Sequence, residues 1–584
     1  MAATVASDAD HSISGATFRG RVALDIPGGV FMKKFVAVLG SVGCLLCQQP
    51  AASPTLVLKA TTRLVMLSVI ARDKNSQPAA DLKKEDFRVK VNGKVQPITV
   101  FSVESTGQLA PAGAQTPGFG PPPGPAPGTL PPNVFSNRLT AQSGTASGIT
   151  IILVDTRNTK MTDQIYAKAQ VVRYLHSLQP TDHVGLYTFG ASLKVLHDYT
   201  SDVSGVLAKL AAAKNWTLPD TAEQDPNSSM QEDSAILDGF IRGAGGTSQA
   251  ERAFYTTDKV LSTLRTFEFI AQHLSQVPGR KNLIWVSGGF PLDVGYDSLK
   301  DWKNPAVDQR MFTEEVDRTL SAMNDANIAV YPVDARGLMT DPRFSAQNSK
   351  IQKRPPLAPP VGVKEQETMQ EMASRTGGLA FYNTNDLARA IHAAVDDSQV
   401  TYTIGFYPSD DGFDGKFHKI DVETPGRSGV KLRYRKGYFD VAEKPQDEKS
   451  RQAELRDAVW SPIDASAIGI VATVKPAANN PAAIDIALKV DHTTIGLQQD
   501  QGRWQGRLDV LFVQRDDQGN EFGGVDDTVN LNLTPETYKK FLTEELAYHR
   551  VVARAAQAKL LRIVVRDAAS GAMGSVTVAL GKVK

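Results

Sequence analysis

The spacing of apolar residues changes several times along the chain, and each change marks a different class of element. Residues 56–104 alternate apolar and polar positions and are rich in Val, Leu and Thr, which predicts four or five strands. Residues 148–398 instead alternate continuous apolar runs with stretches whose apolar residues recur every three or four positions. Short alternating runs return over 400–440 and over 455–584. The pattern therefore predicts an α/β segment between two groups of strands.

The α/β segment has the pattern of a mainly parallel sheet that is covered on both faces. Its predicted strands are the runs 148–154, 184–189, 193–199, 282–287 and 328–334, with LAFYN (379–383) as the last. A continuous apolar run is typical of a strand buried on both faces. Amphipathic stretches such as 163–178 and 259–276 predict the covering helices. Gly190-Ala191-Ser192 predicts a hairpin between the second and third strands, which adds one antiparallel strand at the edge of the sheet.

Composition between these segments sets the domain boundaries. Pro and Gly make up 14 of the 22 residues from Pro111 to Pro132, so no core can form there. The predicted fold class is α/β plus β: a doubly wound, mainly parallel sheet of the Rossmann type, inserted between the strands of a small β-sandwich and followed by a carboxy-terminal antiparallel β-sandwich. The predicted boundaries are 56–106 for the first strands of the small sandwich, 107–147 for a Pro/Gly-rich linker, 148–398 for the α/β domain, 399–441 for the strands that complete the small sandwich, 442–454 for a second linker and 455–584 for the carboxy-terminal sandwich.

The amino-terminal part of the chain has the form of an export signal. Lys33 and Lys34 precede about 13 apolar residues and a small-residue exit, which is the pattern of a secretory signal peptide over 32–52. A membrane-spanning helix needs about 20 apolar residues, so we expect no transmembrane helix in the mature chain. Residues 1–31 are polar and unpatterned, and we interpret them as an over-extended start. The protein is expected to be exported, to the periplasm or beyond.

Charge and cysteine content exclude several classes of protein. The chain has 64 Lys and Arg against 63 Asp and Glu, and removal of residues 1–52 leaves 60 of each. Such a balance argues against a nucleic-acid binder or a polybasic membrane-surface module. Both cysteines, Cys44 and Cys47, lie inside the predicted signal, so the mature chain can form no disulfide and no Cys-based zinc site. A lipid anchor at Cys44 is not expected, because Ser41-Val42-Gly43 lacks the usual Leu of a lipoprotein box.

Several motifs, in the order of the chain, resemble one family. EDFRVKVNGKVQPITVFSVE, ILVDTRNTKMTDQ, PGRKNLIWVSGGFP, VYPVDARGL and YTIGFYPS…FHKIDVET…RYRKGYF together look like the von Willebrand factor A-related family known chiefly from Acidobacteria. The resemblance covers residues from about 56 to 440. It implies an exported protein with a von Willebrand factor A-like α/β domain and no settled activity.

The resemblance also implies a metal-ion-dependent adhesion site, from which this sequence departs. In the family pattern, a D-x-S-x-S loop supplies a carboxylate and two hydroxyls, and the fourth strand ends in Asp-Gly. Here Asp155 and Thr159 match the first and last loop positions, but Arg157 replaces the central Ser and Ser287 replaces the second Asp. Asp334, at the end of the fifth strand, lies where ligands of open α/β sheets bind. Asp155, Thr159 and Asp334 are therefore the candidate metal ligands of a degenerate site.

The expected cofactor is none, with Mg²⁺ or another divalent cation as the alternative. A guanidinium cannot coordinate a cation, and it repels a unit charge by about 4 kcal/mol at roughly 4 Å in an effective dielectric of about 20. Without a cation, we expect a hydrogen-bonded cluster in which Arg157 pairs with Asp155 or Asp334. Two residues are candidates for the Thr that completes the family's site. Thr247 fits the local pattern better, and Thr257 lies at a more usual distance from the fourth strand.

No catalytic motif accompanies these residues. The nine His include no pair three or four positions apart, so there is no zinc-binding helix of the HExxH type, and neither a G-x-S-x-G elbow nor a phosphate-binding loop is present. Ser287 has no evident base as a nucleophile. The acidic runs at 410–415 and Asp526-Asp527 read as solvated turns rather than calcium loops.

The sequence therefore predicts an exported, non-enzymatic binding protein. Its α/β domain would present the loops 155–163, 214–250, 287–300 and 334–365 to a protein or cell-surface partner. A divalent-cation-dependent adhesin that uses the residual metal site is the alternative. An exported hydrolase that uses Ser287, or Asp155 and Asp334 with a metal, is the third reading.

Overall fold

The structure is a computed structural model of the 584-residue chain. It describes residues 64–105, 130–138, 148–178, 183–200, 205–206, 249–277, 279–290, 312–338, 363–397, 399–408, 416–439, 448–478, 480–516 and 518–583. The predicted signal peptide, Cys44, Cys47, Thr247, the acidic run 410–415 and most of the Pro/Gly-rich segment lie outside these ranges.

The central sheet has five strands in the order β10-β9-β6-β7-β8. They are β6 (Ile149–Asp155), β7 (His183–Phe189), β8 (Leu193–Thr200), β9 (Lys281–Ser287) and β10 (Ile328–Asp334). Strands β10, β9, β6 and β7 pair in parallel, and β8 pairs with β7 in the antiparallel sense at the edge. Every residue of β6, β9 and β10 is buried. The predicted parallel sheet and its edge hairpin are confirmed, but the strand predicted over 379–383 is not: Phe381 forms only an isolated parallel bridge with Val333.

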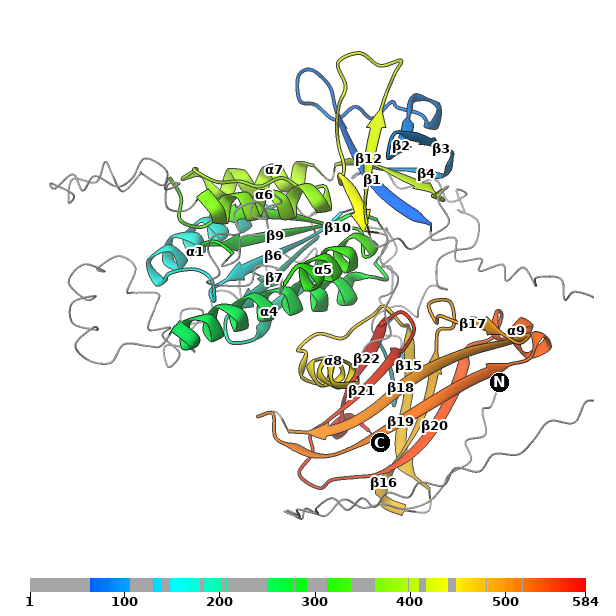
Figure 1. Cartoon of the computed structure of the whole chain (residues 1–584). Coiled ribbons are helices and arrows are strands. Elements are labelled where there is room, and N and C mark those ends of the chain that lie inside the picture. Colours follow the sequence, from blue (N-terminus) through cyan, green and yellow to red (C-terminus); the bar gives the residue numbers. More distant parts are fainter. Residues whose placement is uncertain are drawn as a thin grey trace, which may run out of the picture. The chain divides into compact units, whose positions relative to one another are not determined.

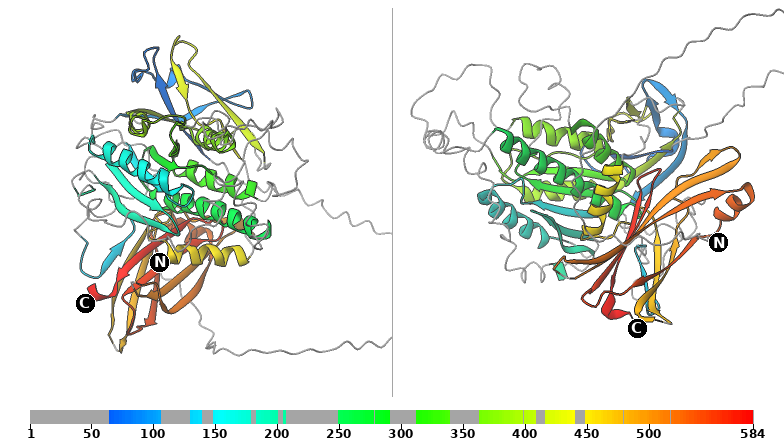
Figure 2. Two further views of the ribbon diagram at one scale, coloured as in Figure 1. Left: turned by 90° about the vertical axis from the view of Figure 1, so that its left-hand side faces the viewer. Right: turned by 60° about the horizontal axis from the view of Figure 1, so that its bottom comes forward.

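Helices cover both faces of this sheet (Figures 1 and 2). They are α1 (Met161–Leu175), α4 (Gln249–Leu274), α5 (Thr313–Asp325), α6 (Val363–Thr376) and α7 (Leu387–Asp396). Ile151 of β6 packs with residues of α4, α5 and α6, such as Phe267 and Leu320, while its neighbour Ile152 packs with residues of α1 and α7. Alternate side chains of each strand therefore enter two separate cores, and a doubly covered α/β domain is confirmed.

Strands from both sides of the α/β domain pair with each other. The sheet β13-β1-β11-β4 combines β1 (Val65–Arg72) and β4 (Ile98–Ser105) with β11 (Val400–Phe406) and β13 (Lys431–Arg433). The sheet β14-β12-β2-β3 combines β2 (Arg88–Val91) and β3 (Lys94–Gln96) with β12 (Phe417–Glu423) and β14 (Gly437–Phe439). In register, Val69 faces Tyr402, and both belong to a core shared by the two sheets.

The carboxy-terminal region consists of two further sheets around one core. Their strands are β15 (Ile470–Ala477), β16 (Asn480–Val490), β17 (Gln498–Asp500), β18 (Arg503–Arg515), β19 (Glu521–Leu533), β20 (Leu546–Ala553), β21 (Leu560–Asp567) and β22 (Met573–Ala579), with the short helix α9 (Pro535–Phe541). All of the strand pairings in this region are antiparallel.

Three sequence-based expectations fail in this part of the chain. The predicted linker 107–147 contains β5 (Val134–Ser136), which pairs with β15 so that Phe135 faces Ala472. The second predicted linker, 442–454, overlaps helix α8 (Glu448–Trp460), whose Leu455 and Val459 are buried against the sandwich. Asp526 and Asp527 lie inside β19 and do not form a turn.

Each failure has a physical cause. A three-residue strand is too short to show a period of two. Helix α8 is rich in charged residues, so its apolar stripe is narrow. Asp527 is tolerated in a strand because Tyr548 donates a hydrogen bond to it across 2.5 Å and Arg550 lies 3.2 Å away. Within the described ranges, no helix is both long and apolar enough to cross a membrane.

Candidate functional site at the carboxyl edge of the central sheet

Three of the residues singled out from the sequence end three neighbouring strands. Asp155 ends β6, Ser287 ends β9 and Asp334 ends β10, and these strands run parallel. Asp334 faces Ser287 in the strand register. All three side chains are fully buried. The sheet therefore brings the predicted residues to one edge, where open α/β sheets bind their ligands.

The Asp155 carboxylate is held by four donors. Oδ1 accepts from the backbone N–H of Asn158 across 3.0 Å. Oδ2 accepts from Asn158 Nδ2 across 2.8 Å, from Trp285 Nε1 across 3.0 Å and from Ser287 Oγ across 3.0 Å. Burial raises the pKa of Asp155, and these hydrogen bonds oppose that effect. A carboxylate offers about four acceptor positions, so the protein itself uses the capacity of this group.

Thr159 joins the loop after β6 to the end of β9. Its Oγ1 donates to the backbone carbonyl of Asp155 and accepts from the N–H of Gly288 across 2.8 Å. A Cβ on Gly288 would lie 3.0 Å from the carbonyl oxygen of Asn158, so glycine permits this close approach. Gln164 Nε2 donates to the carbonyl of Thr159 across 2.7 Å. The family pattern assigns the hydroxyl at this position to a metal, but here the Thr159 hydroxyl forms hydrogen bonds with the backbone of Asp155 and Gly288.

Arg157 pairs with neither of the carboxylates expected from the sequence. Its guanidinium bonds to Asp258 of α4, at the partly exposed outer side of the loop. The expectation of a pair with Asp155 or Asp334 is therefore wrong. The physical reason is that four donors already surround Asp155, while Asp334 has a nearer guanidinium of its own.

That nearer guanidinium belongs to Arg336, two residues after Asp334. Arg336 Nε lies 2.9 Å from Oδ1 and its terminal nitrogen lies 2.9 Å from Oδ2 of Asp334, so the pair is bidentate. The backbone N–H of Arg336 also donates to Oδ1 across 3.0 Å. Arg336 was not among the residues predicted from the sequence, although its D-x-R spacing from Asp334 at the end of a buried strand was the available signal.

A threonine of α4 reaches the site, but it is neither of the two considered. Thr263 Oγ1 accepts from Asn158 Nδ2 across 2.9 Å and is fully buried. Thr257 lies six residues earlier on the same helix, and Thr247 lies outside the described residues. Thr263 therefore supports the amide that in turn holds Asp155.

These residues do not fit a divalent cation. Magnesium requires several free oxygen ligands in an octahedral arrangement. The oxygens of Asp155 and Asp334 are occupied by N–H and O–H donors, and Thr159 Oγ1 accepts from the N–H of Gly288. Across the described ranges, no group of three or more His, Cys, Asp or Glu side chains is arranged to hold a metal.

Ser287 is likewise placed as a structural group. Its Oγ lies 3.0 Å from Asp155 Oδ2 and 3.0 Å from the carbonyl of Gly289, and its side chain is fully buried. A substrate carbonyl would have to reach a hydroxyl that solvent does not reach. Among the described residues, no group is placed to activate this serine as a nucleophile.

Large apolar side chains are exposed near the same edge. Met161 and Ile165 on α1 are 46% and 58% exposed, and Leu338, four residues beyond the end of β10, is 59% exposed. Asn385 lies between them, because its Oδ1 accepts from the N–H of Leu338 across 2.8 Å and its carbonyl accepts from Tyr166 of α1. We refer to Met161, Ile165 and Leu338 as the apolar rim.

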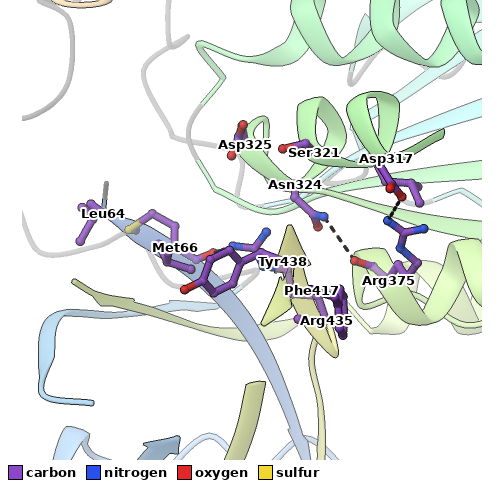
Figure 3. A pocket seen from close by; sticks show the side chains of 13 residues that line it. Leu64, Met66, Asp317, Ser321, Asn324, Asp325, Arg375, Phe417, Arg435 and Tyr438 are labelled. Atoms are coloured by element: carbon purple, nitrogen blue, oxygen red, sulfur yellow. Dashed lines mark hydrogen bonds and ion pairs between the residues drawn. The ribbon is translucent and has the colours of Figure 1, made fainter. Parts of the chain in front are cut away.

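A cavity of about 110 Å³ lies beside the opposite edge of the sheet (Figure 3). Its wall combines α5 and α6 with strands β1, β12 and β14 of the small sandwich. Asp317 and Arg375 pair with each other across 2.6 Å, and Arg435 donates to the carbonyl of Met66 across 2.8 Å. The charged groups of this cavity therefore have protein partners.

Comparison with known proteins gives similarity to solved structures alone. No family model matches the chain, and no curated protein matches it. Similar structures include BatB from Bacteroides thetaiotaomicron (15% identity, TM-score 0.24, 43% of this chain and 98% of that chain). An aerotolerance-related membrane protein from Bacteroides fragilis is 14% identical, with a TM-score of 0.23 over 42% of this chain and 98% of that one. A von Willebrand factor type A protein from Catenulispora acidiphila is 9% identical, with a TM-score of 0.21 over 74% of this chain and 66% of that one.

Scores of this size support no statement about activity, ligand or partner. The α/β assignment rests on the sheet order and the two covered faces. The von Willebrand factor A relationship is a resemblance of motifs and of domain type, and the relation to the acidobacterial family stays a prediction.

Proposed function

We propose that the protein is an exported, non-enzymatic binding protein that presents the carboxyl edge of its α/β domain to a protein or cell-surface partner. One observation carries the proposal. At this edge the buried polar groups bond to one another, while the three side chains of the apolar rim face solvent.

The mutual bonding of the polar groups and the exposure of the apolar rim both favour binding over catalysis. Catalysis needs a reactive group with a free position toward substrate, and the bonding of Asp155, Ser287 and Asp334 provides none. Association needs apolar surface that water leaves on contact, which stabilises a complex by about 25 cal/mol per Å² of buried apolar area. Met161 and Ile165 at the start of α1 and Leu338 after β10 are exposed apolar side chains of this kind on the α/β scaffold.

Site-specific photo-crosslinking in cells that export the full chain tests the proposal. A photoreactive amino acid is placed at Ile165, and in a separate strain at Val551 of β20, which is exposed to a similar degree in the carboxy-terminal sandwich. We expect a discrete crosslinked species from position 165 that Leu338→Asp abolishes. Crosslinks that form equally from position 551, or that survive Leu338→Asp, would contradict an interface at the rim.

A further inference from the structure

We infer that this edge works without a divalent cation, because protein donors supply the positive charge and the hydrogen bonds that an ion supplies in a metal-ion-dependent adhesion site. Arg336 neutralises Asp334, and Asn158, Trp285 and Ser287 hold Asp155. The inference concerns the free protein and stands whether or not a partner binds at the rim.

Arg336 occupies the position beside the Asp334 carboxylate that a cation would take. Asp334 is fully buried, and a buried carboxylate is stable only when it is paired and hydrogen-bonded. The planar guanidinium meets both carboxylate oxygens at 2.9 Å, and the backbone N–H of Arg336 adds a third donor. A cation could reach Asp334 only by displacing a permanently charged group that repels it.

Asp155 excludes a cation for a different reason. Oδ2 accepts three hydrogen bonds and Oδ1 accepts one, and two of the donors to Oδ2, Trp285 Nε1 and Ser287 Oγ, are buried. Displacing Trp285 Nε1 would leave a buried indole N–H without the carboxylate to which it donates, which is unfavourable. Because Trp285 Nε1 bonds to Asp155 directly, the indole N–H is a reporter of any change at the carboxylate.

Arg157 adds a second positive group, in the loop after β6, whereas Arg336 follows β10. Arg157 occupies the position where the family pattern has the central Ser of its metal-binding loop, and Asp258 of α4 holds it. Two loops at this edge thus each carry a guanidinium: Arg336 neutralises Asp334, and Arg157 is held by Asp258 at the outer side.

Manganese titration of the full chain with ¹⁵N-labelled tryptophan tests the inference. Bound Mn²⁺ broadens nearby signals, so an ion at this edge would remove the indole signal of Trp285, assigned by Trp285→Phe. We expect that signal to keep its intensity relative to Trp460, which lies exposed at the end of α8 and reports non-specific effects. Selective loss of the Trp285 signal that Mg²⁺ reverses would overturn the inference.

A thermal measurement on the unaltered protein covers the case in which Trp285→Phe does not fold. After treatment with EDTA, millimolar Mg²⁺, Ca²⁺ or Mn²⁺ is expected to leave the melting temperature unchanged. A saturable rise that Asp334→Asn abolishes would overturn the inference.

Substitution of Arg336 tests whether its guanidinium takes the place of an ion. Arg336→Gln should lower the melting temperature clearly more than Arg427→Gln, because Arg427 pairs with Asp81 at the surface. Equal effects would show that Arg336 does not take the place of an ion.

Discussion

The indole Nε1 of Trp285 donates a hydrogen bond to the carboxylate of Asp155 across 3.0 Å, from one central strand to the next. Trp285 is fully buried, and its ring stands edge-on to Phe267 and Phe290 with centroid distances of 5.3 and 5.9 Å. One side chain therefore joins the apolar core beneath the sheet edge to the polar cluster at its end.

Trp285→Phe should destabilise the protein by about 2–4 kcal/mol, since it removes a donor from a buried carboxylate and leaves a cavity. Denaturant unfolding followed by far-UV circular dichroism measures the change. Trp460→Phe is the matched control, and we expect an effect of about 0.5 kcal/mol or less at that exposed position. Equal losses for the two variants would show that the Trp285–Asp155 bond contributes nothing.

Gly378→Ala should prevent folding or destabilise strongly, by at least about 3 kcal/mol. A Cβ at this position would lie 1.9 Å from the carbonyl oxygen of Val330, so strand β10 and the segment after α6 would have to separate. Gly426→Ala is the control, because a Cβ there meets no atom within 4 Å. Soluble yield and melting temperature distinguish the two, and a Gly378→Ala protein that behaves like Gly426→Ala would contradict the close approach.

Lys281 makes stability depend on pH. Burial lowers the pKa of Lys281 to about 7, although Glu104 acts against this, and Nζ donates to the carbonyl of Val277 across 2.6 Å. Between about pH 7 and pH 10 the unfolded chain keeps the proton that the folded chain releases, so this group makes stability rise by up to about 1.4 kcal/mol per pH unit.

Lys281→Met should therefore stabilise the protein near pH 6, with an advantage that shrinks as the pH rises through the same window. Unfolding in urea at several pH values measures this difference between variant and unaltered protein. The exposed Lys94→Met is the control, and it should give a difference that does not depend on pH. A constant difference for Lys281→Met as well would refute the assignment.

Arg562 anchors helix α8 to the carboxy-terminal sandwich. The side chain is almost fully buried, and it donates to the carbonyls of Ala458 and Ile463 as well as to Asp464. Arg562→Lys cannot make this fan of bonds, and we expect a loss of about 3–5 kcal/mol. Limited proteolysis within Glu448–Trp460 reports the release of the helix, and Arg503→Lys, at an exposed position of β18, should leave the cleavage rate unchanged.

The strands of the central sheet could be predicted from the sequence because burial on both faces requires uninterrupted apolar runs. The runs that end in Asp155, Ser287 and Asp334 each contain seven residues in the structure and are buried throughout. Residues that end parallel neighbours must share an edge, so the location of the site also followed from the sequence.

The partners within the site could not be predicted in the same way. Arg157 lies two residues from Asp155 in the sequence yet bonds to Asp258, because its direction depends on where α4 places that carboxylate. The role of Thr263 depends on the position of Asn158 Nδ2, which no periodicity encodes. Which partner a side chain bonds to depends on differences of a few tenths of an ångström in how elements far apart in the sequence are placed.

Strand β5 has a consequence for how the protein matures. Phe135 pairs with Ala472, so a ribosome adds more than 300 residues between the synthesis of these two partners. The carboxy-terminal sandwich contains one strand that precedes the α/β domain in the sequence, β5, and further strands that follow it. Pairing β5 with β15 closes a loop that includes the whole α/β domain, which slows the completion of the sheet. A fragment that stops at residue 441 would leave Val134–Ser136 without a neighbour, and such an unpaired strand is a site for aggregation. The carboxy-terminal sandwich is therefore interlaced with the domains that precede it, and β5 can pair only after β15 has been made.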